Sequence, residues 1–132
     1  MNTKIILISS CIFLGISGIL LTFIPEEIIS SFGITANPIS TLFFQLLGAL
    51  YLGFAMLNWM AKGVLIGGIY NKPIAIGNFM HFAVGALALV KIVTKMQSHL
   101  EFILPLTIVY SIFALLFAFV FRTNPSKVKE QE

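Results

Sequence analysis

The chain has 132 residues, of which 58% are hydrophobic and only 10% are charged. Soluble domains carry about 25% charged residues, so a water-facing surface cannot be built from this composition. Four apolar segments of about 20 residues, joined by short connections, would fill the whole length. The sequence therefore predicts an all-α membrane protein: a single domain over residues 1–132, folded as an antiparallel up-down bundle of four transmembrane helices.

The single cysteine and the net charge of +3 exclude several other classes of protein. Cys11 alone cannot form an internal disulfide, a CxxC redox pair or a multi-cysteine metal site. The basic residues lie beside the apolar segments, as they do in membrane proteins, and this argues against nucleic acid as a partner. We expect the lipid bilayer as the main partner, with no cofactor and no metal ion.

The first predicted span covers residues 5–24, which contain no charged side chain. A signal peptide or a lipoprotein cleavage box at Cys11 is the alternative, but only residues 5–8 would then form its apolar core, and a signal needs about 7–15. We therefore expect a retained span. Its small side chains recur along one helical stripe, which favours close packing against a neighbour: Cys11, Gly15, Gly18 and Thr22.

Residues 25–38 form the first connection, and their amphipathic pattern fits a short helix at the membrane interface and an ordinary loop equally well. The second predicted span covers residues 39–60, where Trp59 beside Lys62 is typical of an interfacial anchor. Six residues of this span share one helical face: Thr41, Gln45, Gly48, Leu52, Ala55 and Trp59. Ala49 and Gly53 lie beside that face.

The connection over residues 61–73 is too short to cross a bilayer, and its Gly67-Gly68 pair disfavours a helix, so we expect a turn against the interface. The third predicted span, 74–94, carries its polar residues on one stripe that should face protein: Asn78, His81, Gly85, Ala88, Lys91 and, just beyond it, Lys95. The fourth covers residues 102–121, with Pro105 in its first turn. A charged cytoplasmic tail, 122–132, follows.

The basic residues predict the orientation of the bundle. With the first residues in the cytoplasm, six basic residues lie inside and two outside, a bias typical of membrane proteins. The inner set is Lys4, Lys62, Lys72, Arg122, Lys127 and Lys129, and the outer set is Lys91 and Lys95. Both termini should therefore be cytoplasmic.

This topology gives each polar side chain a depth and predicts two clusters. The inner one comprises Asn58, Trp59, Asn78 and His81; the outer one comprises Gln45, Lys91, Thr107, Tyr110 and Ser111, below Glu26, Glu27 and Glu101. Unpaired polar groups are costly in hydrocarbon, so partners are expected within each cluster. The clusters either fix helix packing or line a cavity for a polar headgroup or substrate. Lys91 either extends to the interface or pairs with Glu26 or Glu27.

His81 has three candidate roles: a neutral packing residue bonded to Asn78 or Asn58, a binding or proton-handling group, or a metal or haem ligand shared across a dimer. His99 is 18 residues further on, so the two histidines of one chain should not share an ion. The chain contains no aspartate, and its five glutamates flank or follow the spans. Paired-carboxylate, zinc-hydrolase and triad chemistry therefore lack parts, and an enzyme is disfavoured.

The segment Gln45-Leu-Leu-Gly48-Ala-Leu-Tyr51-Leu-Gly53, followed by Asn58-Trp59, resembles the second span of small four-helix bacterial membrane proteins of unknown function, near the DoxX-like group. Those proteins often carry a basic residue where Gln45 stands. The resemblance implies a bacterial inner membrane location and supplies no reaction.

Three functions remain open. The favoured one is a non-catalytic bundle that binds lipid or supports a partner membrane protein. A small dimeric transporter or channel is the alternative, although no carboxylate lies inside a predicted span. A quinone-linked redox protein would depend on His81 and Tyr110. The sequence does not choose between monomer and homo-oligomer.

Overall fold

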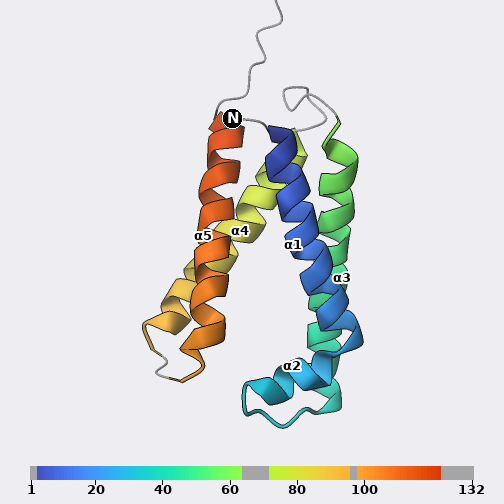
Figure 1. Ribbon diagram of the computed structural model, residues 1–132, viewed down its shortest axis with the longest axis vertical. Coiled ribbons are helices and arrows are strands. Elements are labelled where there is room, and N and C mark those ends of the chain that lie inside the picture. Colours follow the sequence, from blue (N-terminus) through green and yellow to red (C-terminus); the bar gives the residue numbers. More distant parts are fainter. Residues whose placement is uncertain (1–2, 64–71, 96–97, 123–132) are drawn as a thin grey trace, which may run out of the picture. The chain divides into compact units, whose positions relative to one another are not determined.

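A computed structural model of the chain describes residues 3–63, 72–95 and 98–122. These residues form five helices, namely α1 (Thr3–Phe23), α2 (Pro25–Ser31), α3 (Pro38–Ala61), α4 (Lys72–Val93) and α5 (Leu100–Arg122) (Figure 1). All but α2 are long and apolar enough to cross a membrane. The all-α class is confirmed, and each predicted span begins and ends within two residues of the bounds of the corresponding helix. The expected turn within 61–73 and the tail beyond Arg122 fall largely outside the described residues.

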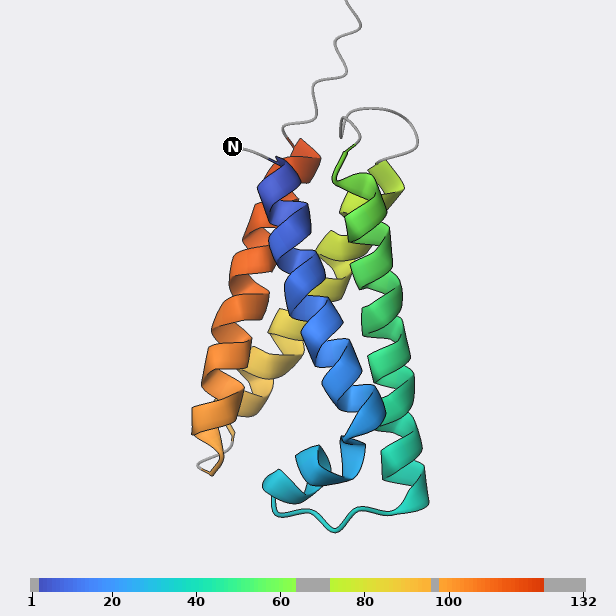
Figure 2. The ribbon, with the colours of Figure 1, turned by 45° about the vertical axis from the view of Figure 1, so that its right-hand side comes forward.

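The helices form two compact units, divided between Lys62 and Gly63. The first contains α1, α2 and α3, and the second contains α4 and α5. Within the first unit α1 and α3 lie side by side and run in opposite directions, as both views show (Figures 1 and 2). Within the second unit α4 and α5 form a similar antiparallel pair. Polar residues of each pair can therefore meet in the contact between its two helices.

Small residues let α1 and α3 approach closely. A Cβ atom added at Gly18 would lie 2.9 Å from Leu52 Cγ and 3.0 Å from the Gly48 carbonyl oxygen. One added at Gly48 would lie 2.9 Å from the Gly18 carbonyl oxygen and would also overlap Thr22 Oγ1. At each position the shortest of these distances is below those that real Cβ atoms show. The carbonyl oxygens belong to the backbone and cannot move aside as a flexible side chain can. The two helices therefore cross where glycine faces glycine, as in other membrane helix pairs.

Of the two structures expected for the connection from α1 to α3, a short helix and a loop, the structure has the helix: residues 25–31 form α2. Its Ile29 side chain is 2% exposed, whereas Glu26 and Glu27 are exposed. Asn37 then caps α3: its side-chain oxygen accepts hydrogen bonds from the amides of Ile39 and Ser40, each at 3.0 Å. The Ser40 hydroxyl accepts one in return from the Asn37 amide. This reciprocal cap fixes where the second span begins.

Aromatic rings fill the contact between α4 and α5. Phe82 of α4 is fully buried and stacks on Phe113 and Phe117 of α5, with ring centroids 4.8 and 5.8 Å apart. His99, just before α5, has a φ of 60°, a left-handed conformation that reverses the chain tightly. Because α5 begins at Leu100, Pro105 lies in its second turn and not in the first. Proline has no backbone N–H, so at this position the helical hydrogen bond from residue 105 to the Glu101 carbonyl is missing.

Candidate functional site

Asn58 meets a partner that the sequence did not indicate. Its side-chain amide donates a 3.0 Å hydrogen bond to the hydroxyl of Ser10 on α1, and both side chains are fully buried. The Ser10 hydroxyl in turn donates to the Leu7 carbonyl at 3.1 Å. The buried line of α1 passes through Leu7, Ser10, Leu14 and Gly18, one helical turn apart, which turns Ser10 toward α3. This hydrogen bond fixes the register of the two helices.

Trp59, the second member of the inner cluster in this unit, lies at the helix end and is 50% exposed. The Lys62 ammonium lies over its ring, a cation–π contact. Desolvation lowers the pKa of Lys62 below its ordinary value, and the positive charge of nearby Lys4 acts in the same direction. Trp59 and Lys62 therefore have the arrangement expected of an interfacial anchor.

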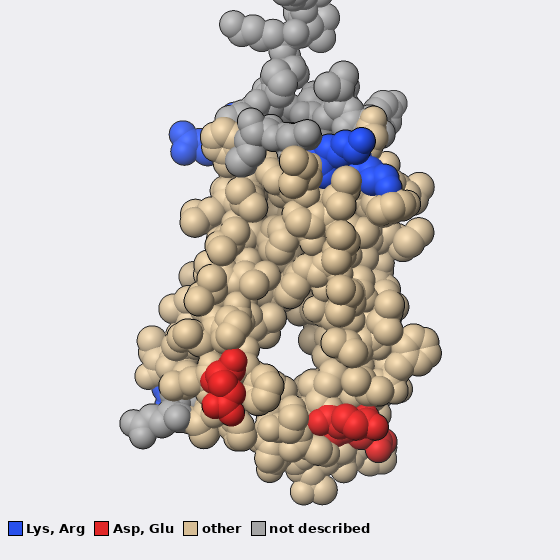
Figure 3. Space-filling view, viewed as in Figure 1, with Lys and Arg blue, Asp and Glu red and all other residues tan. Residues whose placement is uncertain are grey.

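The other predicted residues of the first unit are exposed. The side chain of Gln45 is exposed on α3. Glu26 and Glu27 lie on α2, at the end of the unit away from Lys4 and Lys62, and Figure 3 shows acidic side chains gathered at that end. The unit thus carries opposite charges at its two ends.

In the second unit the structure brings together two residues that the sequence assigned to different clusters. The Tyr110 hydroxyl lies 3.4 Å from Nε2 of His81, and the ring centroids are 5.6 Å apart. His81 lies 12 residues before the end of α4 and Tyr110 lies 10 residues after the start of α5, so antiparallel packing sets them at the same level. The sequence predicted Tyr110 in the outer cluster, nearer the other end of its helix than His81.

Gly85 makes room for the tyrosine. A Cβ atom at position 85 would overlap Cε1 and Cδ1 of the Tyr110 ring, so only glycine lets this ring lie against the α4 backbone. The edge of the ring contacts Phe82, with centroids 5.3 Å apart. Tyr110 is 3% exposed. Its hydroxyl is therefore held at His81 by packing on two sides.

The remaining polar residues of the second unit bond largely to their own helices. Asn78 is fully buried and its amide donates to the Ile74 carbonyl at 2.9 Å. The Thr107 hydroxyl donates to the Ile103 carbonyl, and the Ser111 hydroxyl donates to the Thr107 carbonyl. Such bonds satisfy hydroxyl groups inside a membrane span without a partner helix. Lys91 is exposed in the last turn of α4, where a cation suits the helix dipole.

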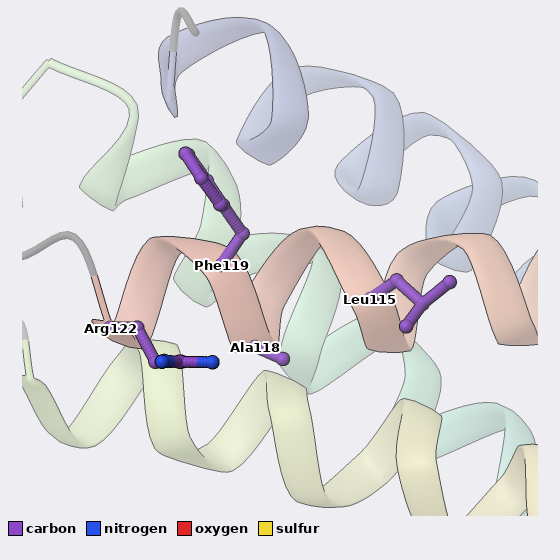
Figure 4. A pocket seen from close by; sticks show the side chains of 4 residues that line it. All are labelled: Leu115, Ala118, Phe119 and Arg122. Atoms are coloured by element: carbon purple, nitrogen blue, oxygen red, sulfur yellow. The ribbon is translucent and has the colours of Figure 1, made fainter.

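A cavity of about 510 Å³ lies on the last two turns of α5, and the sequence did not single it out. Its lining consists of Leu115, Ala118, Phe119 and Arg122, which recur at helical spacing (Figure 4). In Figure 4 Phe119 and Ala118 project to opposite flanks, and Arg122 lies at the end of the helix. The sequence predicted Arg122 only as an inner positive charge.

Among the described residues no group of three or more His, Cys, Asp and Glu side chains could hold a metal ion. We compared the chain with models of protein families, with curated proteins and with solved structures, and none of the three comparisons gives a match. The likeness to DoxX-like proteins therefore stays a prediction.

Proposed function

We propose that this integral membrane protein is a non-catalytic helical bundle that binds lipid or supports a partner membrane protein. One observation carries the proposal: the cavity on α5 is mainly apolar, lies on an exposed helix face and ends in a cation. Lipid has this combination of an apolar body and a charged head. The polar pairs Ser10–Asn58 and His81–Tyr110, by contrast, lie between packed helices.

The charge distribution supports an orientation with both termini in the cytoplasm, and the resemblance to DoxX-like proteins supports a bacterial inner membrane location. In the first unit Lys4 and Lys62 lie at one end, and Glu26 and Glu27 lie at the other. Cytoplasmic ends of membrane helices are enriched in Lys and Arg, so the lysine end is the inner one.

Purification from native membranes in a mild, lipid-preserving polymer tests the proposal. We expect tightly held lipid, a co-purifying membrane protein, or both, detected by mass spectrometry of the purified particle. Proteoliposomes loaded with proton and small-ion gradients supply the control, and we expect no flux above that of empty vesicles. A lone, lipid-free species that carries flux would replace the proposal with a transporter.

The His81–Tyr110 pair favours one second candidate, a membrane protein that handles protons or a quinone. Imidazole and phenol groups within 3.4 Å can exchange a proton or bind a quinone oxygen. The optical spectrum of the natively purified protein decides this case. Bands from a quinone, flavin or haem would support a quinone-linked role, and a spectrum with only aromatic absorption would remove that role.

A further inference from the structure

We propose that the cavity on α5 binds one anionic phospholipid, with the lipid phosphate at Arg122 and an acyl chain in the recess over Ala118. This inference rests on the proposed lipid-binding function. It adds the class of lipid and the residues that select it.

The shape of the cavity suits an acyl chain. Leu115, Ala118, Phe119 and Arg122 follow one another at steps of three, one and three residues and so share one face of α5. The Phe113–Phe117 face, packed on α4, lies about opposite, since each residue turns the helix by about 100°. Leu115 is 74% exposed and Phe119 is 49% exposed. Within this unit the recess therefore opens on the side of α5 that faces away from α4.

The recess also has a direction along the helix. Ala118 has the smallest side chain of the lining, and the larger Phe119 rises on the opposite flank (Figure 4). From Leu115 to Arg122 the helix rises about 10 Å, roughly a third of the hydrocarbon thickness. An acyl chain that lies here would start at the level of Arg122 and run toward the bilayer centre.

Charge complementarity selects the headgroup. Arg122 is the last residue of α5 and is exposed, so its guanidinium group can reach the headgroup level. A guanidinium group offers paired N–H donors that match phosphate oxygens. Lys72 begins α4 at the same end of this antiparallel pair and adds a second exposed positive charge. A zwitterionic lipid would gain less here, because its own cation opposes these charges.

Of the four described residues that line the cavity, only Arg122 could bind a free phosphate ion. Leu115, Ala118 and Phe119 offer it no hydrogen-bond donor from their side chains. A phospholipid engages the cation and the apolar recess together, and we therefore assign the cavity to a lipid.

The test uses the full chain in detergent, incubated with an equimolar mixture of phosphatidylglycerol and phosphatidylcholine that have the same acyl chains. Native mass spectrometry counts each bound lipid. We expect the wild type to retain phosphatidylglycerol preferentially. Arg122→Gln should lower the affinity for phosphatidylglycerol about fivefold, since one basic residue contributes about this much at an anionic surface. It should lower the affinity for phosphatidylcholine less, because the choline cation opposes the attraction between its phosphate and Arg122. Lys95→Gln is the matched control: it removes one exposed cation at the other end of the same unit.

Three further variants or additions separate a site from general surface charge. Arg122→Lys should restore most of the preference, and Ala118→Leu should weaken retention because its side chain fills the recess. Free glycerol phosphate should compete poorly. Equal effects of Arg122→Gln and Lys95→Gln, or no effect of Ala118→Leu, would overturn the site. Equal retention of both lipids by the wild type would overturn the site and leave the proposed function standing. A wild type that holds neither lipid nor partner would overturn the proposed function itself.

Discussion

The buried Ser10–Asn58 hydrogen bond shows how single side chains set the packing of the first unit. Each group would cost free energy if it faced hydrocarbon unpaired, and the two satisfy one another across α1 and α3 at 3.0 Å. The sequence predicted that Asn58 would need a partner. It could not predict Ser10, because a serine in a membrane span can equally bond to its own backbone, as the Ser9 hydroxyl does to the Ile5 carbonyl.

Ser10→Ala should lower the free energy of separating α1 from α3 by about 0.6–2 kcal/mol, since it removes the acceptor of the Asn58 amide. Reversible unfolding in mixed micelles, followed by circular dichroism, measures this change. Ser9→Ala is the control, because the Ser9 hydroxyl is exposed and bonds only within α1. Equal losses for both variants would mean that the interhelical bond contributes nothing.

At the scale of the helices, two glycines of α3 have opposite surroundings. Gly48 faces the backbone of α1, whereas a Cβ atom at Gly53 would meet no atom within 4 Å. The sequence predicted that both would be packing residues, on or beside one face. It could not separate them, because α3 is apolar on nearly all sides and periodicity alone does not show which side α1 covers.

Gly48→Ala should destabilise the α1–α3 pair by about 1–3 kcal/mol, the usual cost of overpacking, because the new methyl group would press on the Gly18 carbonyl. Gly53→Ala in the same helix should be neutral or should stabilise α3 by about 0.5–1 kcal/mol. Unfolding of both variants under identical conditions compares them directly. If Gly53→Ala were the more damaging change, the contact face of α3 would be wrong.

Over the whole molecule, the sequence predicted the spans well and the meeting points of polar residues less well. The thickness of the bilayer fixes how many apolar residues a span needs, so residues 5–24 and 39–60 already matched α1 and α3 closely. The partners of His81 and Asn58 depend on how far each helix slides along its neighbour. The sequence placed Gly18, Gly48 and Gly85 on packing faces, but the atoms that each glycine meets are seen only in the packed pairs.

The charge bias predicts which loops face outward, and cysteine labelling tests it. In a Cys11→Ala background, Thr35→Cys and Ser98→Cys should react with a membrane-impermeant maleimide added to intact cells. Gly63→Cys should react only after the cells are opened, since it follows Lys62 at the inner end. All three positions are exposed. Labelling of Gly63→Cys in intact cells would reverse the proposed orientation.

The division between Lys62 and Gly63 has a consequence for how this gene can be handled. The contact between Gly18 and Gly48 lies wholly before the division, and the stack of Phe82 on Phe113 and Phe117 lies wholly after it. An interruption at that point removes no residue from either set of contacts. A reporter inserted between Lys62 and Gly63, or a reading frame split there into two co-expressed halves, would therefore leave the contacts within each helix pair intact.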